Sequence, residues 1–231
     1  MDDLALLRLE LETLWITDQR GRLLRAVPDD PRSPPLLVVA ACPAGAVWTT
    51  SVAVSDAAHD LVNTLLASEP GADELGWAPS CASSLIDALG AGDVARPHGG
   101  PSYVVSAPLA PTAGADLRSE VEMGGVAALD GLIPEADRGL ASPWVVAIVD
   151  GRVAAVCETA RSTPRSVEAG VWTYEPHRRQ GLGAAVTAAW SARVAGRTAF
   201  YSTSWDNTAS QGVARRLGLR PIGHWWQLSR A

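Results

Sequence analysis

The chain has 231 residues, of which 47% are hydrophobic and 19% are charged, so it can bury a normal core in one large domain or two small ones. Its formal net charge of −6 argues against a general nucleic-acid binder, which needs a basic surface to neutralise phosphates. No run approaches the roughly 18 uninterrupted apolar residues of a membrane span, and the acidic N-terminus lacks the basic residues of a secretory signal. We therefore expect a soluble, cytoplasmic protein that binds neither nucleic acid nor membrane.

The cysteines and the basic residues exclude further kinds of site and mechanism. The three cysteines are widely spaced and form neither a disulfide framework nor a CxxC metal knuckle, so we expect a reducing compartment and no metal ion. All nineteen basic residues are arginines, which excludes mechanisms that depend on a lysine, such as Schiff-base formation or a Walker A phosphate loop. The many Ala, Gly and Pro residues agree with codon bias as the reason for the missing lysines.

The first part of the chain alternates predicted helices and strands. Apolar patterns and turn residues predict a helix at 3–14, strands at 15–25, 36–42 and 47–54, and helices at 56–67 and 80–89. AGDVARPHGGP, residues 91–101, interrupts these patterns, because Gly and Pro continue neither regular element. We place a boundary there, between an N-terminal α+β region at 1–95 and a second domain at 101–231.

The second part interleaves strands and helices. The patterns predict strands at 103–108, 144–162 (two strands), 167–174, 198–204 and 221–228, and helices at 116–129, over about fourteen residues from 182, and at 207–217. Asp150-Gly151 joins the two strands of 144–162 and is the strongest short-range hairpin signal. The interleaving predicts a mixed α/β, or α+β, fold.

HRRQGLGAA, residues 177–185, places arginines and glycines at the start of a predicted helix. The N–H groups of a helix's first turn have no intrahelical partner, and the peptide dipoles leave partial positive charge there, so a phosphate binds at that end. Gly181 and Gly183 let phosphate oxygens approach the backbone, and Arg178 and Arg179 add forked, charged donors. The stretch therefore predicts a pyrophosphate cradle.

Two other phosphate motifs do not fit this stretch. GxxxxGK[ST] is absent, and a dinucleotide-binding turn needs GxGxxG with an acidic residue near the end of the next strand, neither of which is present. The alternative interpretation is a tight strand-to-helix turn with incidental arginines.

The surrounding sequence, VEAGVWTYEPHRRQGLGAA, resembles the central motif of the GNAT superfamily of acyl-CoA-dependent N-acyltransferases. A second superfamily signature, an asparagine followed by a helix that ends in leucine, glycine and a hydrophobic residue, is similar to WDNTASQGVARRLGLRPIG. The resemblance covers about 101–231. It implies a GNAT-like mixed, mostly antiparallel central sheet flanked by helices, and acetyl-CoA as cosubstrate.

The resemblance also implies where acetyl-CoA binds. The strands 167–174 and 198–203 are expected to splay apart around the pantetheine arm, and the pyrophosphate is expected on the first turn of the next helix. Asn207 matches a position whose amide contacts the pantetheine, and a helix N-cap is the compatible alternative for it. The predicted cofactor-binding residues are Val171, Trp172, Thr173, Arg178, Arg179, Gln180, Gly181, Leu182, Gly183, Ala184 and Asn207.

Acyl transfer to an amine needs a base, because a protonated amine cannot attack. Glu168 is the best candidate, since the superfamily often keeps a glutamate on this strand and apolar neighbours would raise its pKa. The alternative is an exposed glutamate on a strand edge. Glu158 on the neighbouring strand and Glu175 in the loop are the second and third candidates for the base.

The departing thiolate benefits from a proton donor. The superfamily tyrosine for this task would fall at Ala214, so the usual acid is missing. Ser210, one turn beyond Asn207 on the same helix face, is our second catalytic candidate, and Tyr201 or water are alternatives. For Cys157, the role of an acyl-carrying nucleophile is a weaker interpretation than that of a buried structural cysteine.

Together these features predict an N-acetyltransferase that moves an acetyl group from acetyl-CoA to a primary amine of a small-molecule or peptide acceptor. A catalytically silent CoA-binding sensor is the alternative function. The N-terminal region is interpreted as a degenerate second acyltransferase-like half, a dimerisation module or a cover for the acceptor site. The tryptophans near the predicted site are candidates to line an acceptor pocket, with core packing as the alternative. They are Trp144, Trp172, Trp190, Trp205, Trp225 and Trp226.

Overall fold

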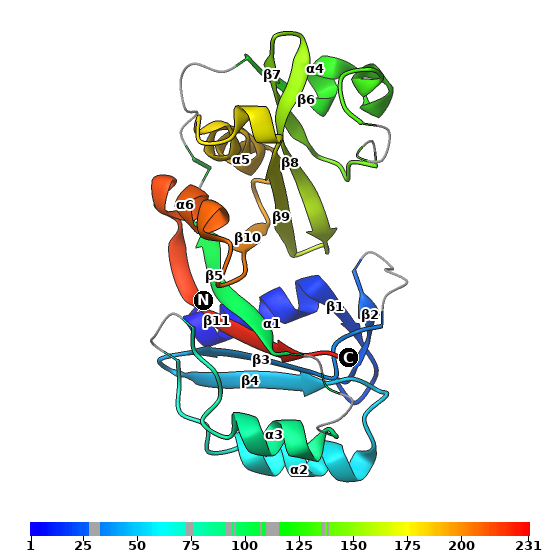
Figure 1. Cartoon of the computed structure of the whole chain (residues 1–231), viewed down its shortest axis with the longest axis vertical. Coiled ribbons are helices and arrows are strands. Elements are labelled where there is room, and N and C mark those ends of the chain that lie inside the picture. The colour runs from blue at the N-terminus through cyan, green and yellow to red at the C-terminus, as the bar shows by residue number, and fades with distance from the viewer. Residues whose placement is uncertain are drawn as a thin grey trace. The chain divides into compact units, whose positions relative to one another are not determined.

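The computed structural model forms two compact units, and Figure 1 shows the elements of both. It describes residues 1–27, 33–72, 76–90, 94, 96–106, 108–109, 116–134, 137 and 139–231. The first unit comprises Met1–Tyr103, Ser202–Asn207 and Pro221–Ala231, and the second comprises Val104–Tyr201 and Thr208–Arg220. Both units thus contain segments distant in sequence, whereas the domains predicted from the sequence are continuous.

The first unit contains a four-stranded arrangement in the order β4-β3-β11-β5 and a separate β1-β2 pair. Its elements are α1 (Asp3–Leu14), β1 (Trp15–Thr17), β2 (Leu23–Ala26), β3 (Leu37–Cys42), β4 (Gly45–Thr50), α2 (Asp56–Leu66), α3 (Ala82–Ala88) and most of β5 (His98–Val105) and β11 (Arg220–Leu228). Asp2 caps α1, because its carboxylate accepts the Ala5 N–H at 2.8 Å. Val62 and Leu66 of α2 pack with Trp226 of β11 in one buried cluster. The helix predicted at 3–14 is confirmed.

The expected break at 91–101 is wrong over its last residues, because β5 begins at His98 and contains Gly99 and Gly100. A Cβ on Gly99 would collide with the Trp225 carbonyl oxygen, and a Cβ on Gly100 with the Thr203 carbonyl oxygen. These glycines therefore serve close backbone packing rather than a turn. Residues 91–93 and 95 lie outside the described residues.

The second unit holds strands in the order β10-β9-β8-β7-β6. Its elements are β6 (Asp116–Ser119), α4 (Glu120–Met123), η1 (Val126–Leu129), β7 (Val145–Val149), β8 (Arg152–Ser162), β9 (Ser166–Thr173), η3 (Glu175–His177), α5 (Leu182–Arg193), most of β10 (Thr198–Ser202) and α6 (Thr208–Arg216). Only β9 and β10 pair in parallel, and the other three neighbouring pairs are antiparallel. The predicted mixed, mostly antiparallel sheet with flanking helices is confirmed. Asp150 (φ 49°) and Gly151 (φ 73°) form the predicted tight turn.

The helix predicted at 116–129 is wrong. Residues 116–119 form β6, which pairs with β7, and only one short turn of α-helix follows. Ser119 and Glu122 form a capping box that starts this turn, and Gly124 in a left-handed conformation (φ 80°) ends it. The apolar residues of this segment fit a helical period, but strand pairing and two consecutive positive-φ glycines divide the segment.

The helix α5 covers one face of the second unit's strands (Figure 1). Val186 and Trp190 are fully buried against Val145 and Val167 of the strands. The Trp190 Nε1 donates a hydrogen bond of 3.0 Å to the Thr159 hydroxyl. Because side chains alternate along a strand, residues 168, 170 and 172 of β9 lie on the face away from α5. That face carries the candidate base.

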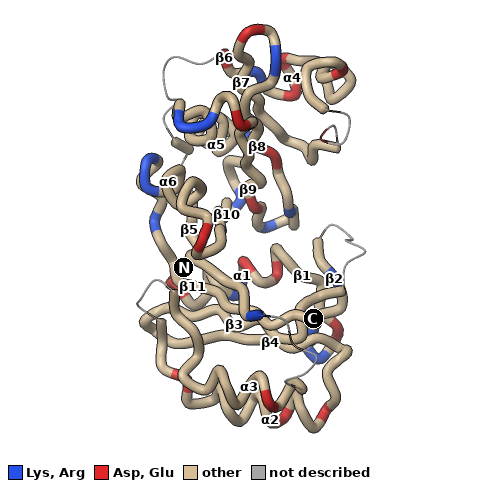
Figure 2. Tube along the Cα trace, viewed as in Figure 1, with Lys and Arg blue, Asp and Glu red and all other residues tan. Residues whose placement is uncertain are grey.

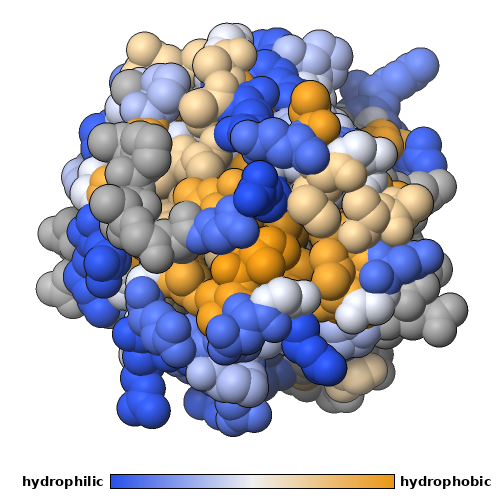
Figure 3. All heavy atoms as spheres, turned by 90° about the horizontal axis from the view of Figure 1, so that it is seen from above, coloured by the Kyte–Doolittle hydropathy of each residue, from blue (hydrophilic) through white to orange (hydrophobic). Residues whose placement is uncertain are grey.

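Apolar side chains also reach the surface. Figure 3 shows them gathered in the centre of the face seen from above, with polar residues around them. Val121 of α4 is 89% exposed and Val126 of η1 is 43% exposed. Within the described part of the chain, no helix combines the length and the apolar character needed to cross a bilayer.

Candidate active site

The strands β9 and β10 pair only near their starts. Their register runs from Thr198 opposite Ser166 to Phe200 opposite Glu168, although β9 continues to Thr173. The Tyr174 N–H donates a hydrogen bond of 2.9 Å to the carbonyl of Ala154 in β8. Because the direction of backbone hydrogen bonds alternates along a strand, the amides of residues 171 and 173 point away from β8, toward the β10 side. These two residues follow Glu168, the last residue of β9 that pairs with β10. This is the edge that the predicted strand splay requires.

The start of α5 lies beside that edge. Gly181 is the N-cap of α5 and has a left-handed backbone conformation (φ 79°), and no side chain makes a capping hydrogen bond there. Arg179 is also left-handed, with φ 63°. The Ala185 N–H makes a helical bond to the Gly181 carbonyl at 3.1 Å, so the N–H groups just before it have no intrahelical partner. A Cβ on Gly183 would lie 3.3 Å from Thr173 Oγ1, so glycine brings the helix start close to the end of β9.

Two arginines precede this helix start in the chain, and a third reaches it from another helix. Arg178 and Arg179 are exposed, and Arg178 Nε donates to the Thr173 carbonyl at 3.2 Å. The third is Arg216 in the last turn of α6, whose guanidinium lies 3.0–3.1 Å from where a Cβ of Gly181 would stand. Figure 2 shows basic positions in the loop before α5 and at the end of α6. Arg216 was missed from the sequence, because arginines in a last helical turn are common without any ligand.

The remaining predicted cradle residues fall into two groups. Gln180 is exposed, with its Nε2 3.5 Å from the Pro176 carbonyl, and it is therefore at the outside of the turn. Leu182, Gly183 and Ala184 are buried in the first turn of α5. The structure thus joins a buried helix start to exposed arginines, an arrangement suited to an anion that is partly enclosed.

Glu168 is only 8% exposed and lies at the last residue of β9 that pairs with β10. It is therefore at the point where the two strands separate, on the face away from α5. Glu175, the third candidate base, is exposed on η3. Among the three glutamates, Glu168 has the most enclosed position.

Glu158 lies on β8 opposite Gly170 of β9. Its Oε2 accepts the Ala141 N–H at 2.6 Å. Burial raises the pKa of the Glu158 carboxyl, against the lowering effects of this hydrogen bond and of the Arg161 charge. A Cβ on Gly170 would stand 3.2 Å from the Glu158 Cγ, so glycine makes room for this side chain.

Ser210 lies on α6 and is in contact with a tyrosine. Its hydroxyl is 2.7 Å from the hydroxyl of Tyr201, which is 3% exposed on β10. Ala214, where the superfamily tyrosine would stand, is fully buried. Asn207 is exposed, directly precedes α6 and donates its N–H to the Ser204 carbonyl at 3.2 Å. Two hydroxyls in hydrogen-bond contact form a pair through which a proton can pass.

Three other candidates from the sequence, one cysteine and two tryptophans, are buried in the core. Cys157 is fully buried on β8, and burial raises the pKa of its thiol well above the ordinary value, so a nucleophilic thiolate is disfavoured. Trp144 and Trp190 are at most 1% exposed, and they fill the core of the second unit rather than a pocket. Among the described residues, no three His, Cys, Asp or Glu side chains gather as metal ligands do.

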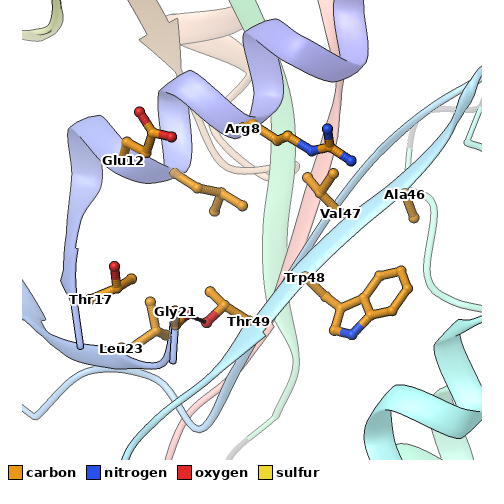
Figure 4. A pocket seen from close by; sticks show the side chains of 10 residues that line it. Arg8, Glu12, Thr17, Gly21, Leu23, Ala46, Val47, Trp48 and Thr49 are labelled. Atoms are coloured by element: carbon orange, nitrogen blue, oxygen red, sulfur yellow. Dashed lines mark hydrogen bonds between the residues drawn. The ribbon is translucent and has the colours of Figure 1, made fainter. Parts of the chain in front are cut away.

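Each unit has a pocket. The first unit has one of about 410 Å³ between α1, the β1-β2 pair and β4, and Figure 4 shows Arg8 and Glu12 of α1 above Trp48 and Thr49 of β4. No predicted site residue lines it. The second unit has a pocket of about 270 Å³, lined by Asp137, Gly139, Leu140, Glu158 and Trp172. Two residues that the sequence had singled out, Glu158 and Trp172, therefore meet at one cavity.

No protein-family model and no curated protein matches this chain. Solved structures do match it. A GCN5-related N-acetyltransferase-like protein from Streptococcus suis is 16% identical over 66% of this chain and 68% of its own, with a TM-score of 0.48. A GCN5-related N-acetyltransferase from Kribbella flavida is 23% identical over 64% of this chain and 63% of its own, with a TM-score of 0.45.

A GNAT-family acetyltransferase from Colwellia psychrerythraea is 15% identical over 80% of this chain and 76% of its own, with a TM-score of 0.44. At these identities, the similarity of the chain to these acetyltransferases is one of fold.

Proposed function

We propose that the second unit is an acetyl-CoA-dependent N-acetyltransferase that acts on a primary amine. The observation that carries this proposal is the start of α5 beside the open edge of β9, with two arginines preceding it and a third reaching it from α6. Such a site suits a ligand that has a diphosphate at one end and an extended amide-bearing arm at the other. Coenzyme A has both parts.

The residues present fit this ligand. The first-turn amides of α5 from Gly181 to Ala184, together with Arg178, Arg179 and Arg216, would hold the diphosphate. Gln180 lies at the outside of the same turn. The outward amides of Val171 and Thr173, next to Trp172, would hold the arm as a neighbouring strand would, and Asn207 before α6 would add an amide contact.

Acetyl-CoA supplies the activated acetyl group and a thiolate leaving group when bound. Glu168 accepts the proton of the incoming ammonium, so that a neutral nitrogen can attack. Its enclosed position, at the last residue of β9 that pairs with β10, favours this role. Ser210 donates a proton to the leaving sulfur, and the Tyr201 hydroxyl, 2.7 Å away, resupplies it.

A silent CoA-binding sensor is the second candidate function. The observation in its favour is Ala214, a fully buried residue without a hydroxyl at the position of the superfamily acid. The two functions share the CoA site and differ in turnover.

Free thiol released from acetyl-CoA in the presence of a panel of primary amines tests the proposal. We expect amine-dependent thiol release together with CoA binding in calorimetry. CoA binding without thiol release for any amine would favour the sensor. If CoA does not bind, both functions are wrong.

Replacing Ser210 by alanine should lower kcat for acetyl transfer by about tenfold, below the 10²–10⁴-fold typical of general acids, because a thiolate leaves readily. Tyr201→Phe should lower kcat less, since Ser210 keeps its own proton. Steady-state kinetics with a fixed amine measures both effects. Thr208→Ala, which removes an exposed hydroxyl from the same helix, is the matched control. A rise in KM for acetyl-CoA at unchanged kcat would contradict the assigned role.

A further inference from the structure

The pocket of about 270 Å³ in the second unit lies on the sheet face away from α5. Trp172 alternates with Val171, which packs in the cluster around α5, so the indole is on the opposite face. Glu158 is on that face as well, since it stands opposite Gly170, two residues before Trp172. The pocket therefore shares a strand face with Glu168, the proposed base.

The described part of the pocket wall is acidic. Of the five described residues that line it, the two charged ones are Asp137 and Glu158. The Tyr174 hydroxyl donates to Asp137 Oδ2 at 2.8 Å, and the Ala141 N–H donates to Glu158 Oε2 at 2.6 Å. These bonds fix the direction of both carboxylates, and each carboxylate has a second oxygen that can accept from an occupant.

Two partly buried carboxylates at one cavity favour a positively charged occupant. Burial raises the pKa of Glu158, because the charged carboxylate loses solvation in this position. A cation in the pocket would replace the missing solvation and add charge-assisted hydrogen bonds.

Trp172 also lines the pocket. Its Nε1 is buried near the Tyr174 hydroxyl, without a hydrogen bond of ordinary distance and angle to any described residue. This N–H is a donor, and an ammonium group has no acceptor for it, so the indole would contribute to the proposed site through its ring face. An indole at a pocket wall also attracts cations.

We propose that this pocket holds the second ammonium group of a dicationic acceptor, while the first amine reacts beside Glu168. This inference depends on the proposed function. Glu168 lies two residues from Gly170, which is about 7 Å along a strand. A linear alkyl diamine such as 1,5-diaminopentane spans a comparable distance between its nitrogens.

The test compares 1,5-diaminopentane with 1-aminopentane, which has the same chain and one ammonium group. We expect kcat/KM for acetyl transfer to the diamine to exceed that for the monoamine by at least tenfold, mainly through a lower KM. Equal values for the two amines would overturn the proposal.

Glu158→Gln is the main variant, because it removes one charge at nearly the same size. The ratio of the two kcat/KM values should fall toward one in this variant and in Asp137→Asn. Asp60→Asn, which removes an exposed charge from α2 of the first unit, should leave the ratio at the wild-type value. Calorimetric titration with CoA shows that each variant is folded. An unchanged ratio in both pocket variants would contradict the proposal.

Direct binding of 1,5-diaminopentane, measured by calorimetry without acetyl-CoA, separates this inference from the proposed function. Binding that weakens at least tenfold in Glu158→Gln, with no acetyl transfer to any amine, would support a dication site and contradict the acetyltransferase. Acetyl transfer to monoamines without preferential diamine binding would support the acetyltransferase and overturn the dication site.

The preference for the diamine should depend on pH. A raised pKa means that Glu158 takes up a proton at a higher pH than an ordinary glutamate. The preference should therefore be complete above this pKa and decline as the pH falls through it. The described charged or titratable groups that act on Glu158 or share its pocket are Arg161, Cys157, Asp137 and Tyr174, which is bonded to Asp137.

Discussion

Replacing Glu168 by glutamine should lower kcat for acetyl transfer by about 10²–10⁴-fold, the range typical of a lost general base. Glutamine keeps the size of the side chain but cannot accept the amine proton. Affinity for CoA should stay near the wild-type value, because the proposed diphosphate and arm contacts do not include this side chain. Thiol release with a fixed amine and calorimetry with CoA measure the two quantities separately.

Two further measurements make the role of Glu168 specific. Glu175→Gln removes an exposed glutamate from η3 and should leave kcat unchanged. Glu168→Asp, which keeps a carboxylate on a shorter side chain, should retain more of the wild-type kcat than Glu168→Gln. If the variant keeps wild-type kcat, the amine loses its proton to another group and the assignment is wrong.

Replacing Arg216 by alanine should weaken acetyl-CoA binding by about 10- to 100-fold, since a hydrogen bond to a charged group contributes about 1.5–3 kcal/mol. The guanidinium stands next to Gly181, at the start of α5 where the diphosphate is proposed to bind. S-acetylpantetheine, which lacks the diphosphate, separates this effect from general damage. The KM for acetyl-CoA should rise in the variant, and the KM for S-acetylpantetheine should not.

Arg215→Ala is the matched control for Arg216, because Arg215 is the preceding exposed arginine of α6. We expect a much smaller effect from it. A uniform loss of activity with both acyl donors in Arg216→Ala would show that Arg216 supports the fold rather than the diphosphate.

Local signals in the sequence predicted much of the fold. The helix at 3–14 has an N-cap aspartate, and Asp150-Gly151 has the left-handed preference of a tight hairpin, so both could be recognised from short segments. Where distant packing overrides local preference, prediction failed. Gly99 and Gly100 resemble a break but lie in β5, and residues 116–119 resemble a helix but pair with β7.

The candidate site likewise has a part that could be predicted from a short segment and a part that could not. The stretch 178–184 carries its own chemistry, because glycines, arginines and a helix start are contiguous, and the sequence by itself determined that a phosphate cradle was the natural interpretation. Only the tertiary structure decided that Arg216 stands at Gly181 and that Glu158, Trp172 and Asp137 line one cavity. The physical reason is that strand pairing and helix packing set these distances, and such contacts between distant segments leave no short-range pattern in the sequence.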